Sequence, residues 1–170
     1  MAVPYLRHDE LEKLYAHIDN QRDRLLAQFL YESGCSVKDV THLRTASIKP
    51  DGVVTLEGRT SRISPSLAAA LRRDAGEYAF GTRQGATITA KRVQQILKPH
   101  LALITKEKPT PHLLRYTHII HAYQNGVGLH AIGAQTGITL VRLSQIINDI
   151  DRNDIGYSAF FKTGKRGGAT

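Results

Sequence analysis

The chain has 170 residues, 41% of them hydrophobic and 22% charged, which is typical of one globular domain with its own hydrophobic core. Its formal net charge of +8 indicates a polyanionic partner, and nucleic acid is the leading candidate. No apolar run approaches the roughly 20 residues that cross a bilayer, and the N-terminus has no hydrophobic signal region. We therefore expect a cytoplasmic, nucleoid-associated protein with no membrane partner.

The first half of the chain predicts helices followed by a small sheet. Helical periodicity runs through residues 8–34, and a short helix is expected at residues 35–43. Residues 48–56 have the pattern of a strand, a Pro-Asp-Gly turn and a second strand, and residues 62–63 suggest a short third strand. A helix with Ser and Pro at its start is expected at residues 64–73.

The second half predicts helices only. Residues 76–85 read as a loop, and Thr87 or Thr89 caps a helix that ends near residues 98–100. The expected fold class is therefore α+β and mostly helical, with a small antiparallel sheet near the N-terminal third of the chain. One domain is expected over residues 1–161, with a basic flexible tail over residues 162–170. Three further helices are expected at residues 112–125, 129–137 and 140–149.

The helix that begins near Thr89 is the best candidate for reading DNA bases. Its apolar residues can face the core, while polar side chains project from its first turns. Arg and Lys pair with guanine and Gln with adenine in the major groove. A solvated polar face is the alternative, because the same residues are good surface helix formers. The predicted base-reading residues are Thr89, Lys91, Arg92 and Gln95.

The segment around His112-Leu-Leu-Arg115 resembles the His-x-x-Arg box of the tyrosine recombinase (phage integrase) family. In that family one arginine grips the scissile phosphate, and a tyrosine further along the chain attacks it. The family's first box, where a helix ends in Thr-Gly-Leu-Arg, resembles the sequence that ends at Ser36, with Asp39 at the usual glutamate. The hairpin that carries the family's catalytic lysine resembles residues 53–59, with Arg59 at the lysine.

The resemblance also shows three departures from the catalytic pattern. Ser36 stands at the first arginine, Ile138 at the last histidine or tryptophan, and Ile147 at the nucleophilic tyrosine. Loss of one oxyanion donor costs on the order of a hundred- to a thousand-fold in rate, and isoleucine cannot attack a phosphate. We therefore expect that the chain is not an enzyme. The cationic residues that remain to bind a DNA phosphate are Arg59, Arg62, His112 and Arg115.

These features together predict a degenerate recombinase domain that binds duplex DNA without cutting it. It would serve as a transcription regulator, or as an accessory or architectural factor beside an active integrase. Two alternatives stay open: a strand transferase that uses a displaced tyrosine such as Tyr157, and a protein-interaction module. The single cysteine excludes an internal disulfide, no Cys/His cluster has zinc-ligand spacing, and no cofactor is expected.

The C-terminal segment predicts self-association. Its apolar side chains need cover, and a basic, glycine-rich stretch follows them. In the resembling family the segment beyond the nucleophile docks onto a neighbouring subunit, which implies a homo-oligomer; folding back onto the same domain is the alternative. The family also usually carries a separate DNA-clamping domain, and this chain is expected to begin after it. The predicted docking residues are Ile155, Tyr157, Phe160 and Phe161.

Overall fold

The computed structural model describes residues 3–73 and 76–148. The helical stretch predicted at the N-terminus divides into two helices, because the chain turns at Ile18. Asn20 starts the second helix by accepting a hydrogen bond from the backbone N–H of Asp23 at 3.1 Å. Arg24 closes the turn by donating to the carbonyl of Ile18 at 2.9 Å. These helices are α1 (His8–His17) and α2 (Gln21–Ser33), and the short helices α3 (Val37–Thr41) and η1 (Thr45–Ser47) follow.

The expected small antiparallel sheet is confirmed, but it has two strands rather than three. β1 (Val53–Leu56) pairs with β2 (Arg59–Arg62), and Leu56 lies opposite Arg59. Ile48 contributes only an isolated bridge to Val54, because the N–H of Gly52 bonds back to the carbonyl of Lys49 in a tight turn. Of the predicted third strand at residues 62–63, Arg62 is the last residue of β2 and Ile63 lies just beyond it.

The helix predicted after Thr89 is longer than expected. α5 (Ala90–Ile104) continues past Pro99, where the sequence predicted its end. Proline removes one backbone hydrogen bond inside a helix. Here Leu97 and Leu101, on either side of Pro99, are fully buried, and their packing holds the helix together. The remaining helices are α4 (Pro65–Arg73), α6 (His112–Gln124), α7 (Leu129–Thr136) and α8 (Leu140–Asn148), close to their predicted positions.

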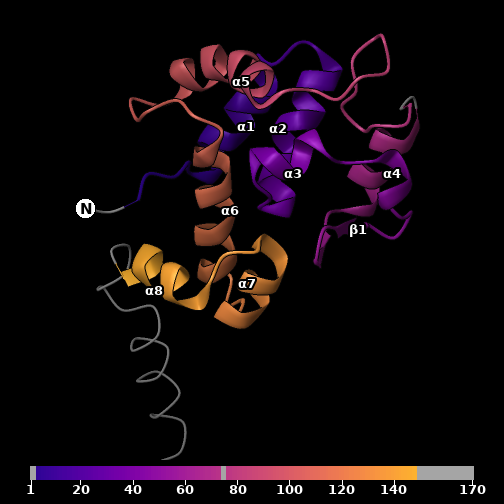
Figure 1. Ribbon diagram of the computed structural model, residues 1–170. Helices are drawn as coiled ribbons and strands as arrows, with labels where there is room; N and C mark the ends of the chain where they lie inside the picture. The colour runs from indigo at the N-terminus through magenta and orange to yellow at the C-terminus, as the bar shows by residue number, and fades with distance from the viewer. Residues whose placement is uncertain (1–2, 74–75, 149–170) are drawn as a thin grey trace, which may run out of the picture.

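Two hydrophobic clusters hold the fold together. The larger cluster contains residues from each of the helices α1 through α5 and from β1, and α6 contributes Leu113 and Leu114 to it. The smaller cluster lies between the end of α6, α7 and α8, and consists of Ile119, Ile132, Leu143 and Ile146. Figure 1 shows α6 running from the upper helices to α7 and α8 below. Within residues 3–73 and 76–148, no helix has the length and apolar character needed to cross a membrane.

Candidate nucleic-acid interface

Arg115 lies on α6 at the point where the C-terminal ends of two other helices meet. Its Nε–H donates to the carbonyl oxygen of Gly34 at 3.0 Å, and its Nη2 donates to that of Thr136 at 2.6 Å. These carbonyls end α2 and α7, and the negative ends of helix dipoles favour a cation. Burial lowers the pKa of Arg115, and the charge of Asp39 opposes that shift. Because arginine stays protonated near neutral pH, Arg115 is a fixed, partly buried cation.

Both helices that hold Arg115 end on a glycine with positive φ. The φ angle is 65° at Gly34 and 76° at Gly137, a conformation that side chains with a Cβ rarely adopt. Space is limited as well: a Cβ on Gly34 would lie 2.5 Å from the ring of His118. A Cβ on Gly137 would lie 3.0 Å from the guanidinium of Arg59. Gly137 therefore lets Arg59 approach the end of α7, and Gly34 leaves room for His118 at the end of α2.

Arg59, the first residue of β2, reaches into the same region. Its Nη2 forms an ion pair with Asp39 at 2.8 Å and contacts the sulfur of Cys35 at 3.5 Å. Burial by itself would lower the pKa of Arg59, but its hydrogen bond and charge interaction with Asp39 raise it overall. Burial likewise acts to raise the pKa of Asp39, but hydrogen bonds from Arg59 and Ser36 lower it overall. Arg59 Nε is buried and has no hydrogen-bond partner among the described residues.

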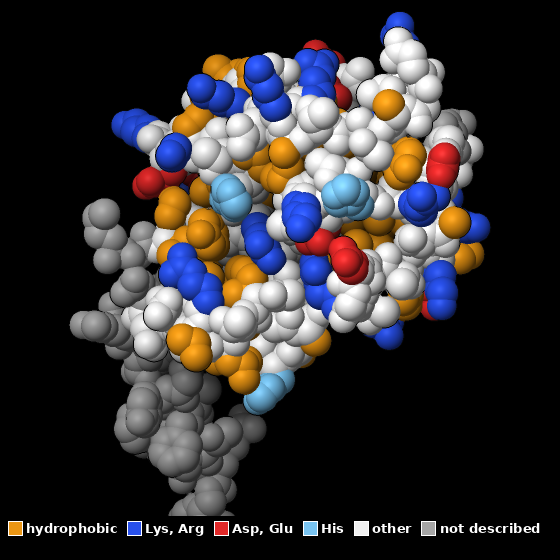
Figure 2. Space-filling view, in the orientation of Figure 1, with side chains coloured by type: hydrophobic (Ala, Val, Ile, Leu, Met, Phe, Trp, Pro, Cys, Tyr) orange, Lys and Arg blue, Asp and Glu red, His pale blue; other side chains and the backbone are white. Residues whose placement is uncertain are grey.

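We call Arg59, Arg115 and Asp39 the Arg59–Arg115 centre. Two guanidinium groups and one carboxylate leave one excess positive charge at this point of the fold. Arg115 has five N–H donors and its two bonds use two of them, so donors remain for an anion. Figure 2 shows Lys and Arg side chains spread over one face of the molecule, with fewer Asp and Glu side chains among them. Chemically, the centre suits a phosphate oxygen.

The three positions that depart from the family pattern have structural roles. Ser36 caps α3: its backbone N–H and its hydroxyl both donate to Asp39, at 2.9 and 2.8 Å. Ile147 is 7% exposed on α8, and Ile138 packs against the smaller hydrophobic cluster. Arg59 supplies a guanidinium to the carboxylate that Ser36 also contacts. The charge that serine cannot provide is thus present from the hairpin.

Two other predicted phosphate contacts lie outside the Arg59–Arg115 centre. His112 is the exposed first residue of α6, one turn before Arg115. Arg62 lies three residues after Arg59 on β2, so the two side chains leave opposite faces of the strand. Arg62 lines a cavity of about 420 Å³ together with His118 and Gln135. Of the four predicted phosphate-binding residues, the structure therefore brings only Arg59 and Arg115 together at one site.

The predicted base-reading residues occupy the first turns of α5. Thr89 is the N-cap, and its hydroxyl oxygen accepts a hydrogen bond from the backbone N–H of Arg92 at 3.1 Å. Lys91, Arg92 and Gln95 are exposed, as expected of side chains that reach outward. Arg92 also lines a cavity shared with Arg22 of α2. Thr89 therefore has a capping role in the structure, and base reading by this helix remains a prediction.

Two residues that position the site were not among the predicted site residues. Gln135 holds the hairpin to α7: its amide accepts from the N–H of Arg62 at 2.8 Å and donates to the carbonyl of Arg62 at 2.6 Å. His118 donates from Nδ1 to the carbonyl of Tyr31 at 2.7 Å, and burial lowers its pKa to about 4. His118 follows Arg115 by three residues on the same face of α6, and this spacing in the sequence could have identified it as a neighbour of the site.

The predicted docking residues Ile155, Tyr157, Phe160 and Phe161 and the basic tail at 162–170 lie outside the described residues. Among the residues that are described, no group of three or more His, Cys, Asp or Glu side chains gathers as metal ligands would.

Comparison with known proteins identifies the fold. The sequence profile of the phage integrase family matches residues 4–146. The crystal structure of XerA recombinase superposes with a TM-score of 0.76 at 17% identity, covering 99% of this chain and 65% of that one. A lambda integrase dimer bound to a COC′ core site superposes with a TM-score of 0.70 at 18% identity, covering 91% and 50%. The expected recombinase-like fold is confirmed.

Curated relatives give the same result. The chain is 28% identical over 170 residues to tyrosine recombinase XerC of Erythrobacter litoralis, a match that covers 86% of this chain and 55% of the relative. It is 22% identical over 157 residues to tyrosine recombinase XerD of Staphylococcus aureus, which covers 81% and 53%. The chain therefore spans about half the length of the curated relatives it matches.

These relatives correct one expectation from the sequence. The chain was expected not to be an enzyme, yet its relatives are named tyrosine recombinases, which are enzymes. The expectation weighed each substituted position by itself. The structure shows why the positions should be considered together: Arg59 brings a guanidinium to Asp39, beside the substituted Ser36.

Proposed function

Because the chain belongs to the phage integrase family, we propose that it binds duplex DNA and acts in DNA recombination, with a backbone phosphate held at the Arg59–Arg115 centre. One observation carries the proposal: two guanidinium groups from α6 and β2 are fixed at the ends of α2 and α7. Guanidinium donors pair with phosphate oxygens, and arginine held in advance loses little side-chain entropy on binding. Crystal structures of XerH with difH DNA support it by analogy of fold.

We propose that α5 supplies sequence specificity beside this phosphate contact. Lys91, Arg92 and Gln95 project from its first two turns, where side chains of a helix in the major groove meet base edges. A phosphate contact fixes register without reading sequence, so the two surfaces have separable effects. His112 and Arg62 would then add contacts to flanking phosphates, since both side chains are exposed.

Selection from random duplexes with the purified protein, followed by sequencing, tests the proposal. An enriched motif is expected. Lys91→Ala or Arg92→Ala should cost on the order of 1 to 3 kcal/mol on that motif and little on random DNA. Arg59→Ala should weaken both duplexes about equally. If no duplex is bound more tightly than heparin, a nonspecific polyanion, the chain is a protein-interaction module and the proposal fails.

The finer role we propose is occupation of a DNA site as a transcription regulator or as an accessory factor of recombination. Strand transfer with a displaced tyrosine is the second candidate, favoured by the enzymatic relatives. Incubation with a nicked suicide duplex separates the two roles. Any covalent adduct has to form on a residue other than Ile147, which has no nucleophilic atom. An adduct that disappears in Tyr157→Phe would establish strand transfer.

We also propose that residues 155–161 dock onto a second copy of the chain. Four large apolar side chains in seven residues support this, since they need cover from water. A truncation after Asp154 should stay folded, become monomeric by light scattering and lose more DNA affinity than truncation after Phe161, because linked copies bind adjacent sites cooperatively. An intact chain that is monomeric both free and on DNA would contradict this part of the proposal.

A further inference from the structure

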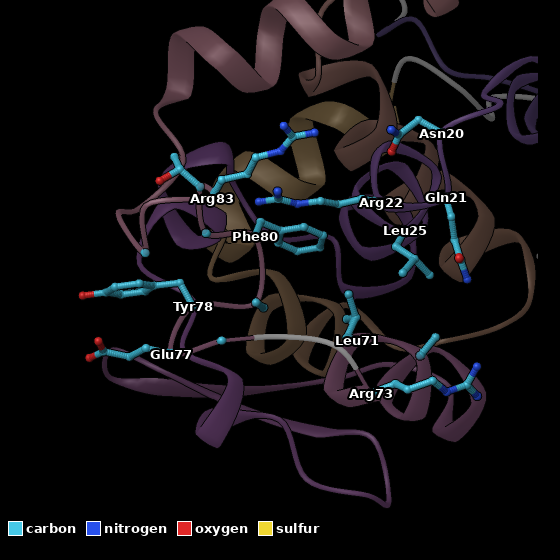
Figure 3. A pocket seen from close by; sticks show the side chains of 16 residues that line it. Asn20, Gln21, Arg22, Leu25, Leu71, Arg73, Glu77, Tyr78, Phe80 and Arg83 are labelled. Atoms are coloured by element: carbon cyan, nitrogen blue, oxygen red, sulfur yellow. The ribbon is translucent and has the colours of Figure 1, made fainter.

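Two cavities share residues at the start of α2 and in the loop at 76–85; α4 also lines the larger cavity, and the first turns of α5 line the smaller. The larger has a volume of about 440 Å³ and the smaller about 310 Å³. Arg22 of α2 and Arg83 of the loop line both cavities. Figure 3 shows the two side chains running in opposite directions above the ring of Phe80, and in this view their guanidinium groups lie one above the other. We call Arg22 and Arg83, with the two cavities, the Arg22–Arg83 site.

More positive than negative charge surrounds this site. Arg92 of α5 lines the smaller cavity, and Arg73 of α4 lines the larger one. The acidic residues among the described lining are Glu77 in the larger cavity and Asp23 in the smaller. Glu77 is already engaged in an ion pair with Arg44. Counting only residues 3–73 and 76–148, each cavity is therefore lined by three arginines and one carboxylate, an excess of two positive charges.

The guanidinium groups of this site have no carboxylate partner in residues 3–73 and 76–148. Arg22, Arg73, Arg83 and Arg92 form no ion pair with any described acidic residue, whereas Arg59 of the Arg59–Arg115 centre lies 2.8 Å from Asp39. Two guanidinium groups that line the same cavities repel one another, and an anion between them offsets that repulsion. A tetrahedral oxyanion can accept hydrogen bonds from both at once.

The position of the site in the fold indicates which anion it takes. Arg92 belongs both to the exposed first turns of α5 and to the lining of the smaller cavity. If α5 enters the major groove, the groove's flanking backbone passes close to Arg92. A phosphate of that backbone is thereby presented to Arg22 and Arg83.

We propose that Arg22 and Arg83 form a second phosphate site, which holds one DNA backbone phosphate beside the groove that α5 reads. This inference rests on the proposed DNA-binding function and deepens it. It assigns to the chain two phosphate contacts on different elements: one at the Arg59–Arg115 centre, from α6 and β2, and one from α2 and the loop at 76–85. Together the two contacts fix the orientation of α5 in the groove.

The test compares Arg22→Gln, Arg83→Gln and the double variant on the duplex enriched by selection. Because both arginines hold one phosphate, each single variant should lower the slope of log affinity against log salt by about 0.9, and the double variant by no more. Affinity should fall about tenfold in each variant, without additivity. Arg72→Gln removes an exposed arginine of α4 that lines neither cavity, and should change neither quantity. All replaced side chains are exposed, so the variants should remain folded.

Duplexes that carry one neutral methylphosphonate each identify the phosphate. One position should weaken the wild type and leave the double variant unaffected. A titration with inorganic phosphate shows whether the site takes a free phosphate compound instead: saturation in the wild type that is lost in the double variant, with no sensitive methylphosphonate position, would overturn the DNA assignment. Losses that add in the double variant, or that match Arg72→Gln, would overturn the shared site. If Arg115→Gln still weakens duplex binding, only this inference fails; if no duplex binds at all, the proposed function fails with it.

Discussion

The two arginine regions of this protein differ in what holds their charges. At the Arg59–Arg115 centre, Asp39 and the carbonyls that end α2 and α7 bind the guanidinium groups directly. At the Arg22–Arg83 site, the arginines are exposed and have no carboxylate partner among the described residues. Similar side chains therefore have different roles: the first pair also stabilises the folded framework, whereas the second pair is available only to a ligand.

Removal of Arg115 is the most direct way to separate the regions by stability. Arg115→Met keeps the length of the side chain but deletes two charge-assisted hydrogen bonds and leaves two carbonyls without their partner. The free energy of unfolding should fall by about 4 kcal/mol. Arg22→Met, the matched control, should change it by less than about 0.5 kcal/mol. Urea denaturation measures both, and equal small losses would contradict the framework role of Arg115.

Acid should destabilise the region around the Arg59–Arg115 centre through His118. Its pKa is about 4 in the folded protein, chiefly because of burial, against a usual 6.5. Between these pH values the unfolded chain binds more protons than the folded protein does. The contribution of neutral His118 to the free energy of unfolding is therefore complete above pH 6.5 and is lost as the pH falls toward 4. The loss amounts to about 3 kcal/mol. Unfolding free energies measured from pH 7 to pH 4 should depend less steeply on pH in His118→Gln, where His121 still contributes.

An unchanged pH dependence in His118→Gln would show that His118 is not the group that responds to acid. The burial of this ring against Gly34 would then need another explanation.

Asp39→Asn should change stability and DNA affinity in opposite directions. The ion pair with Arg59 is about one-fifth exposed, so its loss should cost about 1 kcal/mol in urea denaturation. Duplex affinity should rise about tenfold, since Arg59 is freed and a carboxylate near the phosphate is removed. Asp23→Asn is the control: this carboxylate lines the smaller cavity without an ion pair among the described residues, and its replacement should not reduce stability measurably. Weaker duplex binding by Asp39→Asn would mean that Arg59 needs Asp39 for its position.

The sequence predicted one arginine region and missed the other for a physical reason. The spacing of His112 and Arg115 and the pattern of the hairpin led to the Arg59–Arg115 centre, although not to the pairing of Arg59 with Asp39. Arg22 and Arg83 line the same cavities only because the fold brings α2 beside the loop at 76–85, and no local pattern encodes that proximity.

The same distinction holds for the fold. Helix positions followed from apolar periodicity and capping residues, and most of them are confirmed. α5 ran past Pro99 because buried neighbours at positions 97 and 101 outweigh the local cost of proline. The first predicted strand, which begins at Ile48, is reduced to a single bridge because a tight turn at Gly52 follows it. Tertiary packing decided the first departure, and the local turn decided the second.

Salt dependence of duplex binding tests the central claim, that the Arg59–Arg115 centre holds a DNA phosphate. Affinity of the wild type and of folded Arg115→Gln would be measured on the selected duplex and on a random duplex across a range of salt concentrations. The account predicts a linear fall of log affinity with log salt, and a slope smaller by about 0.9 in the variant on both duplexes. A folded variant with the slope and affinity of the wild type would contradict it.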